Sequence, residues 1–151
     1  GAVIYSDLSQ SMGKNIVFSW DKALSLEGDS APYLQYTYAR AKSILRKAGE
    51  KEFAPAVDEK TTITTEREKN LVLLIARFPD ISKQAAIFSA PHSIAEYLND
   101  LAQAFNRFYA QDPVLDADLG IKNTRLAIVY ATAQVVKNGL TLLGIKTLER
   151  M

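Results

Sequence analysis

Cysteine does not occur among the 151 residues, and histidine occurs only once, as His92. Without cysteine the chain cannot form disulfides, zinc–thiolate sites or a thiolate nucleophile. Glu96 follows His92 by one helical turn, but one such pair is far short of a metal site, and no nucleophile elbow surrounds a serine. The seven glycines are scattered, so no G-x-G-x-x-G or phosphate-binding loop is present. We therefore expect no catalytic residue, cofactor site or metal site.

Long apolar runs are also missing, because none approaches the roughly 20 residues that a membrane-spanning helix needs. The first ten residues have neither the basic region nor the cleavage pattern of a signal peptide. Hydrophobic residues make up 48% of the chain without low-complexity runs, which predicts one soluble globular domain. The net charge of +1 points to no polyanionic partner by itself, but basic residues outnumber acidic ones five to one in 30–51 and in 121–151.

Hydrophobic periodicity predicts an all-α fold, a helical bundle of about five helices. The helical period is found in residues 30–49, 66–78, 80–89, 91–112, and from about 123 to an end or break between Gly139 and Gly144. Residues 2–10 suit a short helix or a helix end, and residues 15–20 a short strand or an extended segment. The charged segment 50–63 lacks a period and contains Pro55, so we expect a long connection there.

The segment 30–49 has clear helix boundaries and two aromatic faces. Ser30 is a suitable N-cap, Pro32 lies in the first turn, and Gly49 follows the last turn as a stop. At about 100° per residue, one face carries Leu34, Tyr38, Ala41 and Leu45. A second face carries Tyr33, Tyr36, Arg40, Ile44 and Lys47. The first face predicts a core contact, whereas the second combines flat rings with cations.

Local signals also define the helices that follow. Thr64 or Thr65 is expected to cap the helix at 66–78, with Glu66 and Glu68 in the first turn, where the helix dipole favours acidic groups. The helix at 91–112 has a core stripe of Ile94, Leu98, Leu101, Phe105 and Phe108, with Tyr97 and Tyr109 near its margins.

Two interpretations of the Tyr33 face remain open at this point. Aromatic rings beside arginine and lysine suit stacking on unpaired bases and pairing with phosphates. The same residues also suit a second packing face with cations at its solvated edge, or a surface that binds a peptide or a partner helix.

Three stretches, in order and correctly spaced, carry a resemblance to a known family. They are "SWDKALSLEGDSAPYLQYTYARAKSILRKAG", "PHSIAEYLNDLAQAFNRFYAQDPVL" and "TRLAIVYATAQVVKNGLTLLGIKTLERM". Together they resemble the C-terminal part of arginyl-tRNA synthetase, a class I aminoacyl-tRNA synthetase, with the all-α anticodon-binding domain of the DALR type. "PYLQYTYAR" and the final Glu-Arg-Met disfavour the related cysteinyl and glycyl enzymes. Leu148 replaces the proline expected before Glu-Arg-Met.

The resemblance implies a division of the chain and of the enzyme. Residues 1–29 would be the tail of the catalytic core and a connector, and residues 30–151 the anticodon-binding domain. The nucleotide-binding signatures of the family are missing, so this chain would be an inactive fragment of an arginine–tRNA ligase, and ATP would bind only to the parent enzyme. The implied partners are arginine tRNA and the catalytic core of the same polypeptide, in the cytoplasm, with neither DNA nor a membrane. A helical protein-interaction domain remains the alternative.

The resemblance also implies an anticodon pocket. Every arginine codon has G at its middle position, so the middle anticodon base is always C, and one pocket for an unstacked cytosine serves all these tRNAs. The residues implied to line or shape it are Tyr33, Tyr36, Arg40, Arg46, Tyr109 and Met151. We also count Lys47 among the expected RNA-binding residues, and a contact with a phosphate would distinguish it from the others. The loop 50–63 would lie near the anticodon stem or loop.

The two ends of the chain give two further expectations. Residues 1–29 contain apolar side chains that the parent would bury against its core, so we expect this segment to be poorly ordered or packed on a neighbouring copy. These side chains are Ile4, Leu8, Ile16, Val17, Phe18 and Trp20. At the other end, Ile145, Leu148 and Met151 recur every three residues, which predicts a final helical turn held against the domain.

Overall fold

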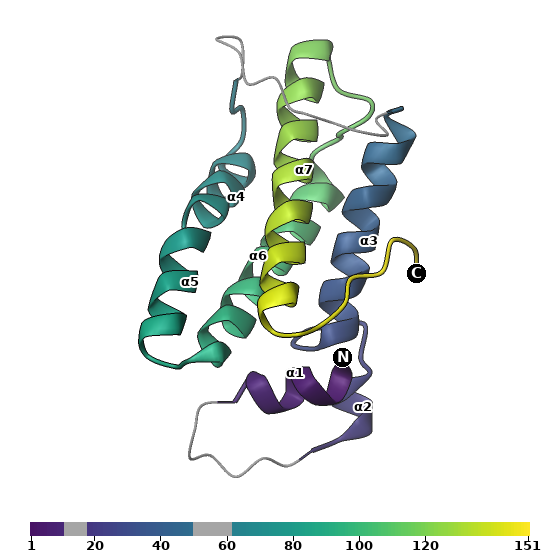
Figure 1. Cartoon of the computed structure of the whole chain (residues 1–151). Helices are drawn as coiled ribbons and strands as arrows, with labels where there is room; N and C mark the ends of the chain where they lie inside the picture. The colour runs from purple at the N-terminus through teal and green to yellow at the C-terminus, as the bar shows by residue number, and fades with distance from the viewer. Residues whose placement is uncertain (11–17, 50–61) are drawn as a thin grey trace.

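The computed structural model describes residues 1–10, 18–49 and 62–151, and within these ranges it contains helices and no strand (Figure 1). The helices are α1 (Ala2–Leu8), α2 (Trp20–Ala23), α3 (Ala31–Lys47), α4 (Glu66–Ala76), α5 (Phe78–Ile87), α6 (Pro91–Gln111) and α7 (Leu119–Leu142). Helices α3 to α7 form the bundle, with α6 and α7 between α3 on one side and α4 and α5 on the other. The predicted all-α bundle of about five helices is confirmed.

Helix α3 begins and ends where its local signals predict. The Ser30 side chain accepts a hydrogen bond from the backbone N–H of Tyr33 at 3.2 Å, and Gly49 adopts a positive φ of 85° that suits glycine after a helix end. All four residues of the predicted core face are buried. Ile44 is also buried, although its spacing placed it on the Tyr33 face. The core therefore extends further around α3 than one apolar stripe indicates.

Helices α4 and α5 follow each other with only Arg77 between them. Thr65 caps α4 in a capping box, in which its side chain accepts from the Glu68 backbone and the Glu68 carboxylate accepts from the Thr65 backbone. Glu68 is fully buried and also accepts a hydrogen bond from Arg125 Nε of α7 at 2.6 Å. An N-terminal cap is thus also the point where α4 is joined to α7.

Helix α6 is the central element, and its five predicted core residues are all buried. Tyr97 is buried rather than marginal, with its hydroxyl donating to the Leu74 carbonyl at 2.8 Å, whereas Tyr109 is 41% exposed. Helix α7 packs closely on α6, since a Cβ on Gly139 would lie 2.6 Å from Leu98 Cδ2. Helix α7 ends before Gly144, inside the predicted window.

The N-terminal segment differs from its expectation. Helix α1 packs against α3 and α6 and inserts Tyr5, which is 2% exposed; its hydroxyl donates to Asp29 and lies 3.3 Å from the Ala95 carbonyl oxygen. Leu8 packs partly against the core, whereas Ile4, Phe18 and Trp20 are exposed. The prediction of poor order did not take Tyr5 into account. Its apolar ring suits burial against the core, and its hydroxyl suits the polar groups beside it.

Two other predictions fall mostly outside the described residues. Of the short strand or extended segment expected at 15–20, Ser19 has an extended backbone and Trp20 begins α2, and no strand is found where the chain is described; residues 15–17, with Ile16 and Val17, lie outside the described residues. The predicted connection 50–63 also lies outside them except for residues 62 and 63, which are irregular. Its expected position near an RNA stem is not tested.

The predicted final helical turn is wrong. Residues 145–151 are not helical, and only Ile145 is buried, while Leu148 is 43% and Met151 57% exposed. The segment runs along α3 instead, where Gln35 donates to the Lys146 carbonyl and Tyr38 donates to the Glu149 side chain. Hydrogen bonds to α3 hold the chain end, so the spacing of its apolar residues by three does not reflect a helical turn.

Candidate functional site

Arg40 lies between two aromatic rings on the exposed side of α3. Its Cζ is 4.5 Å from the centre of the Tyr36 ring and 5.5 Å from the centre of the Tyr109 ring, both within cation–π range. Tyr36 comes from one turn earlier on α3, and Tyr109 from the C-terminal end of α6. The Tyr109 ring also stacks on the buried Phe105 at an interplanar angle of 10°. The guanidinium is therefore held by a ring that the core itself supports.

Hydrogen bonds fix the direction of the Arg40 guanidinium. Nη2 donates to the Tyr36 hydroxyl at 2.6 Å, and Nη1 donates to Asn106 Oδ1 at 2.8 Å. Asn106 Nδ2 donates in turn to the Tyr33 hydroxyl at 2.9 Å and to Thr37 Oγ1 at 3.4 Å. A guanidinium has five N–H donors, so three of them make no hydrogen bond among the residues that the structure describes. Asn106 was absent from the predicted site, because a single polar residue beside the α6 stripe carries no functional signal in sequence.

A hollow of about 350 Å³ lies next to Arg40, between α3 and the end of the chain. It is lined by Tyr36, Ala39, Arg40, Ser43, Arg46, Arg150 and Met151. Its three arginines come from α3 and from the last residues of the chain, and no acidic side chain is among its lining residues. Such a site offers planar cationic donors to an anion or to the polar edge of a base.

Four of the seven predicted site residues meet in this hollow, namely Tyr36, Arg40, Arg46 and Met151. Tyr109 contacts Arg40 from outside the hollow, and Tyr33 connects to it only through Asn106 while packing partly against the core. Lys47 is exposed on the last turn of α3 and does not line the hollow. Arg150 lines it but was not predicted, because sequence spacing cannot place a terminal residue beside α3.

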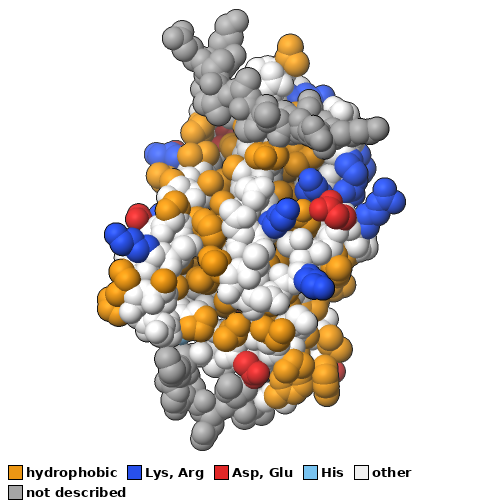
Figure 2. All heavy atoms as spheres, in the orientation of Figure 1, with side chains coloured by type: hydrophobic (Ala, Val, Ile, Leu, Met, Phe, Trp, Pro, Cys, Tyr) orange, Lys and Arg blue, Asp and Glu red, His pale blue; other side chains and the backbone are white. Residues whose placement is uncertain are grey.

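Basic side chains surround the hollow more widely. Figure 2 shows Lys and Arg side chains gathered near the C-terminal end of the chain and the last turns of α3, around a small acidic group. The residues in these two segments include Arg46, Lys47, Lys146 and Arg150, all exposed, with Glu149 as the acidic neighbour. The opposite edge of the bundle shows fewer such groups in this view.

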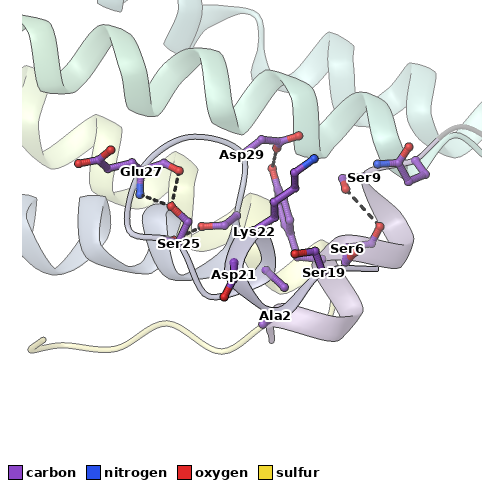
Figure 3. Close-up of a pocket in the computed structure, with 13 residues that line it drawn as sticks. Ala2, Ser6, Ser9, Ser19, Asp21, Lys22, Ser25, Glu27 and Asp29 are labelled. Atoms are coloured by element: carbon purple, nitrogen blue, oxygen red, sulfur yellow. Dashed lines mark hydrogen bonds between the residues drawn. The ribbon is translucent and has the colours of Figure 1, made fainter. Parts of the chain in front are cut away.

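A larger cavity of about 520 Å³ lies elsewhere, between α1, α2 and the segment before α3 (Figure 3). Serine and acidic side chains line much of it, and several are hydrogen-bonded within it: Ser9 donates to the Ser6 carbonyl and Ser25 to the Glu27 carbonyl. It contains none of the predicted site residues. Its lining has three carboxylates and one cation, Lys22, so it suits an anion less well than the smaller arginine-lined hollow, which is the better candidate despite its size.

Metal and membrane features are not found in the described part of the chain. No group of three or more His, Cys, Asp or Glu side chains lies close enough to hold a metal ion within residues 1–10, 18–49 and 62–151. None of the helices in those ranges has both the length and the apolar composition needed to cross a membrane.

Comparison with known proteins gives one consistent family. The family model of the DALR anticodon binding domain matches residues 34–151. The arginine–tRNA ligases of Pyrococcus abyssi and Thermococcus kodakarensis are 45% and 48% identical to this chain over its whole length. The chain spans only 24% of the length of each of these relatives.

Solved structures agree with the sequence comparison. The arginyl-tRNA synthetase of Thermus thermophilus superposes with a TM-score of 0.90 at 39% identity, covering 100% of this chain and 26% of that one. The synthetase of Plasmodium falciparum superposes with a TM-score of 0.85 at 30% identity, covering 99% of this chain and 26% of that one. The bundle that presents the arginine-lined hollow is therefore a DALR anticodon-binding domain, and the chain belongs to this family as it occurs in arginine–tRNA ligases.

Proposed function

We propose that this chain binds the anticodon of arginine tRNA through the hollow between α3 and the chain end. The observation that carries the proposal is Arg40, whose guanidinium carbon lies over both the Tyr36 and the Tyr109 ring and which has N–H donors without a hydrogen bond among the described residues, beside two further arginines. An unstacked cytosine presents ring-nitrogen and carbonyl acceptors that suit such donors, and its ring suits stacking on tyrosine. Arginine tRNAs share a middle cytosine, so one pocket for this base suits them all.

The seven predicted residues have different parts in this proposal. Tyr36 and Tyr109 supply flat surfaces, Arg40 and Arg46 supply donors, and Met151 closes one wall of the hollow. Tyr33 acts indirectly, since its hydroxyl accepts from Asn106, which orients Arg40. Lys47 is assigned to a backbone phosphate, because it is exposed close to the basic end of α3 and outside the hollow.

Binding of arginine tRNA in a gel-shift titration tests the pocket. Stacking on an aromatic side chain contributes about 1–3 kcal/mol per base, so Tyr36→Ala should weaken binding roughly 5- to 150-fold and leave the salt dependence nearly unchanged. Phe88→Ala is the matched control, because this ring is 73% exposed at the turn between α5 and α6. Lys47→Ala should instead lower the salt slope by about one and affect all tRNAs alike.

The same titration separates RNA from a polypeptide partner. Phosphate contacts release counterions, so RNA binding weakens steeply as salt rises, whereas an apolar peptide contact does not. Equal losses in Tyr36→Ala for arginine tRNA and for a tRNA with another middle base would contradict the cytosine pocket. A shallow salt slope together with capture of a peptide would favour the alternative of a protein-interaction domain.

We further propose that the N-terminal end of the chain packs against the rest of a parent arginine–tRNA ligase. Large apolar side chains are exposed there, on or beside α1 and α2: Val3, Ile4, Phe18, Trp20, Leu24 and Leu26. They precede the family match at residue 34, and relatives carry about three quarters of their length outside the matched region. Arginine activation, ATP binding and a cytoplasmic location belong to that parent in this proposal.

A paired measurement tests this contact. Trp20→Ser should leave the thermal stability of this chain unchanged, because the side chain is 60% exposed, but should increase proteolytic cleavage near residue 20 in the full-length ligase. Leu119→Ser is the control, since this residue is 76% exposed at the start of α7. Equal cleavage of the parent and its Trp20→Ser variant would contradict the contact.

A further inference from the structure

The last seven residues are held along α3 by hydrogen bonds to the helix. Gln35 Nε2 donates to the Lys146 carbonyl at 2.6 Å, and Arg46 Nη1 donates to the Glu149 carbonyl at 3.2 Å. Between them, the Tyr38 hydroxyl donates to Glu149 Oε1 at 2.8 Å. Glu149 is therefore bound through both its side chain and its backbone, more than any other residue of this segment in the described contacts.

Apolar burial does little to hold the segment beyond its first residue. Ile145 is 3% exposed, but Leu148 and Met151 are 43% and 57% exposed. The two residues after Glu149 are Arg150 and Met151, which line the hollow. Their position there thus depends on the contacts of Glu149.

Tyr38 is a rigid support for these contacts. Its ring is 3% exposed in the core of α3, so the hydroxyl has little freedom to follow a moving partner. Burial and the hydrogen bond to Glu149 raise the pKa of Tyr38 to about 12, so the hydroxyl remains a donor at neutral pH.

We propose that Glu149 and Tyr38 are positioning residues for the hollow, and that their hydrogen bond sets Arg150 and Met151 against Arg40 and Arg46 for RNA binding. This inference rests on the proposed function. Charge alone would make Glu149 unfavourable, because a carboxylate among arginines repels phosphate and attracts the cations that RNA would use. A positioning role and a charge effect therefore predict opposite results when Glu149 is replaced.

Two replacements of Glu149 separate the roles. Glu149→Gln keeps a carbonyl oxygen that accepts from Tyr38 but removes the charge, so binding of an arginine tRNA transcript should equal or exceed that of the unchanged chain. Glu149→Ala removes the acceptor, and we expect roughly 3- to 10-fold weaker binding, the range for loss of one hydrogen bond. Tyr38→Phe should weaken binding to a similar extent, and the double variant Tyr38→Phe with Glu149→Ala no further.

Glu66→Gln is the charge control, because its side chain is 91% exposed on α4 and the net charge changes equally. Helix content and thermal stability should be unchanged in the Glu149 variants, since Glu149 is exposed and lies outside the helices. Tight binding by both Glu149→Ala and Glu149→Gln would show a charge effect alone and overturn the inference. Equally weak binding by both would also overturn it, because Glu149→Gln keeps the hydrogen bond from Tyr38, and that bond would then not be enough to position the chain end.

A readout without RNA distinguishes failure of this inference from failure of the proposed function. The chain has two methionines, Met12 and Met151, so the Met151 methyl resonance can be assigned with a Met151→Leu variant. In Glu149→Ala and Tyr38→Phe this resonance should narrow and move to the shift of a flexible methionine, and in Glu149→Gln it should not. An unchanged resonance in Glu149→Ala overturns the inference even if tRNA binds, whereas the expected shift without tRNA binding contradicts only the proposed function.

Discussion

Replacing Glu68 by glutamine should destabilise the bundle far more than the same replacement of an exposed glutamate. Glu68 is 0% exposed, and its carboxylate accepts from the backbone N–H groups of Thr64 and Thr65 and from Arg125 Nε. The Arg125 side chain is 9% exposed, so the pair is almost completely removed from water. Glutamine has the same shape but only one acceptor oxygen and no charge, so Arg125 would lose its nearest counter-charge.

The size of the loss in stability depends on the contacts that Arg125 keeps in the Glu68→Gln variant. Removing one partner of a buried ion pair costs about 3–5 kcal/mol, because the other charge stays buried without compensation. Here Arg125 still donates to the Pro113 carbonyl at 2.6 Å and lies 3.7 Å from Asp112 Oδ1. These contacts place Glu68→Gln near the lower end, about 3 kcal/mol in the free energy of unfolding. For a domain of this size that is roughly 6–12 °C in Tm.

Urea titration followed by circular dichroism measures this loss, with Glu66→Gln as the control. Both residues lie in the first turn of α4, so both changes remove the same interaction with the helix dipole, but the Glu66 side chain is 91% exposed and lies 3.9 Å from Lys69. Glu66→Gln should cost less than about 1 kcal/mol. If the two variants differ by less than about 0.5 kcal/mol, the pair does not stabilise the bundle and the reasoning is wrong.

The pH dependence gives an independent check of the same pair. Burial alone would raise the pKa of Glu68, but hydrogen bonds from the Thr64 backbone, the Arg125 guanidinium and the Thr65 backbone outweigh it, so the pKa lies below its ordinary value. A carboxyl with a lowered folded-state pKa stabilises the fold above its unfolded pKa, and that stabilisation is lost as pH falls through the folded pKa. The gap between the unchanged chain and Glu68→Gln should therefore be constant above about pH 5 and shrink below about pH 4.

Replacing Gly139 and Gly120 by alanine should change the free energy of unfolding in opposite directions. The purified chain should also lack the arginine activation proposed for the parent ligase. Gly139→Ala should lower the free energy of unfolding by about 1 kcal/mol or more, because its Cβ would lie 2.6 and 2.8 Å from the two Leu98 Cδ atoms in the α6–α7 contact, which outweighs the gain in helix propensity. Gly120→Ala meets nothing within 4 Å and should stabilise α7 by up to about 1 kcal/mol, so equal effects in thermal melts would contradict the packing argument. The purified chain should not catalyse arginine-dependent ATP–pyrophosphate exchange, because the sequence holds no recognisable nucleotide site; exchange above background would refute this.

Sequence alone determined the elements whose causes are local. The start of α3 at Ser30, its end before Gly49 and the buried stripe of α6 were all predicted, and the cap of α4, Thr65, was one of the two threonines predicted for it. Caps act within three residues and the helical repeat within two turns, so these features need no knowledge of the rest of the chain. Tyr36 and Arg40 of the candidate site belong to the same class, because they are one turn apart on α3.

Tertiary structure alone decided the contacts between residues far apart in sequence. Burial of Tyr5 and Ile44, the role of Asn106 and the path of residues 145–151 were missed or wrong, and each depends on packing between separate elements. The hydrogen bond from Tyr38 to Glu149 joins residues 111 positions apart, so no periodic pattern in the sequence can predict it. Apolar spacing shows that a residue suits burial, but only the neighbouring helices decide whether it is covered, because the hydrophobic effect has no direction of its own.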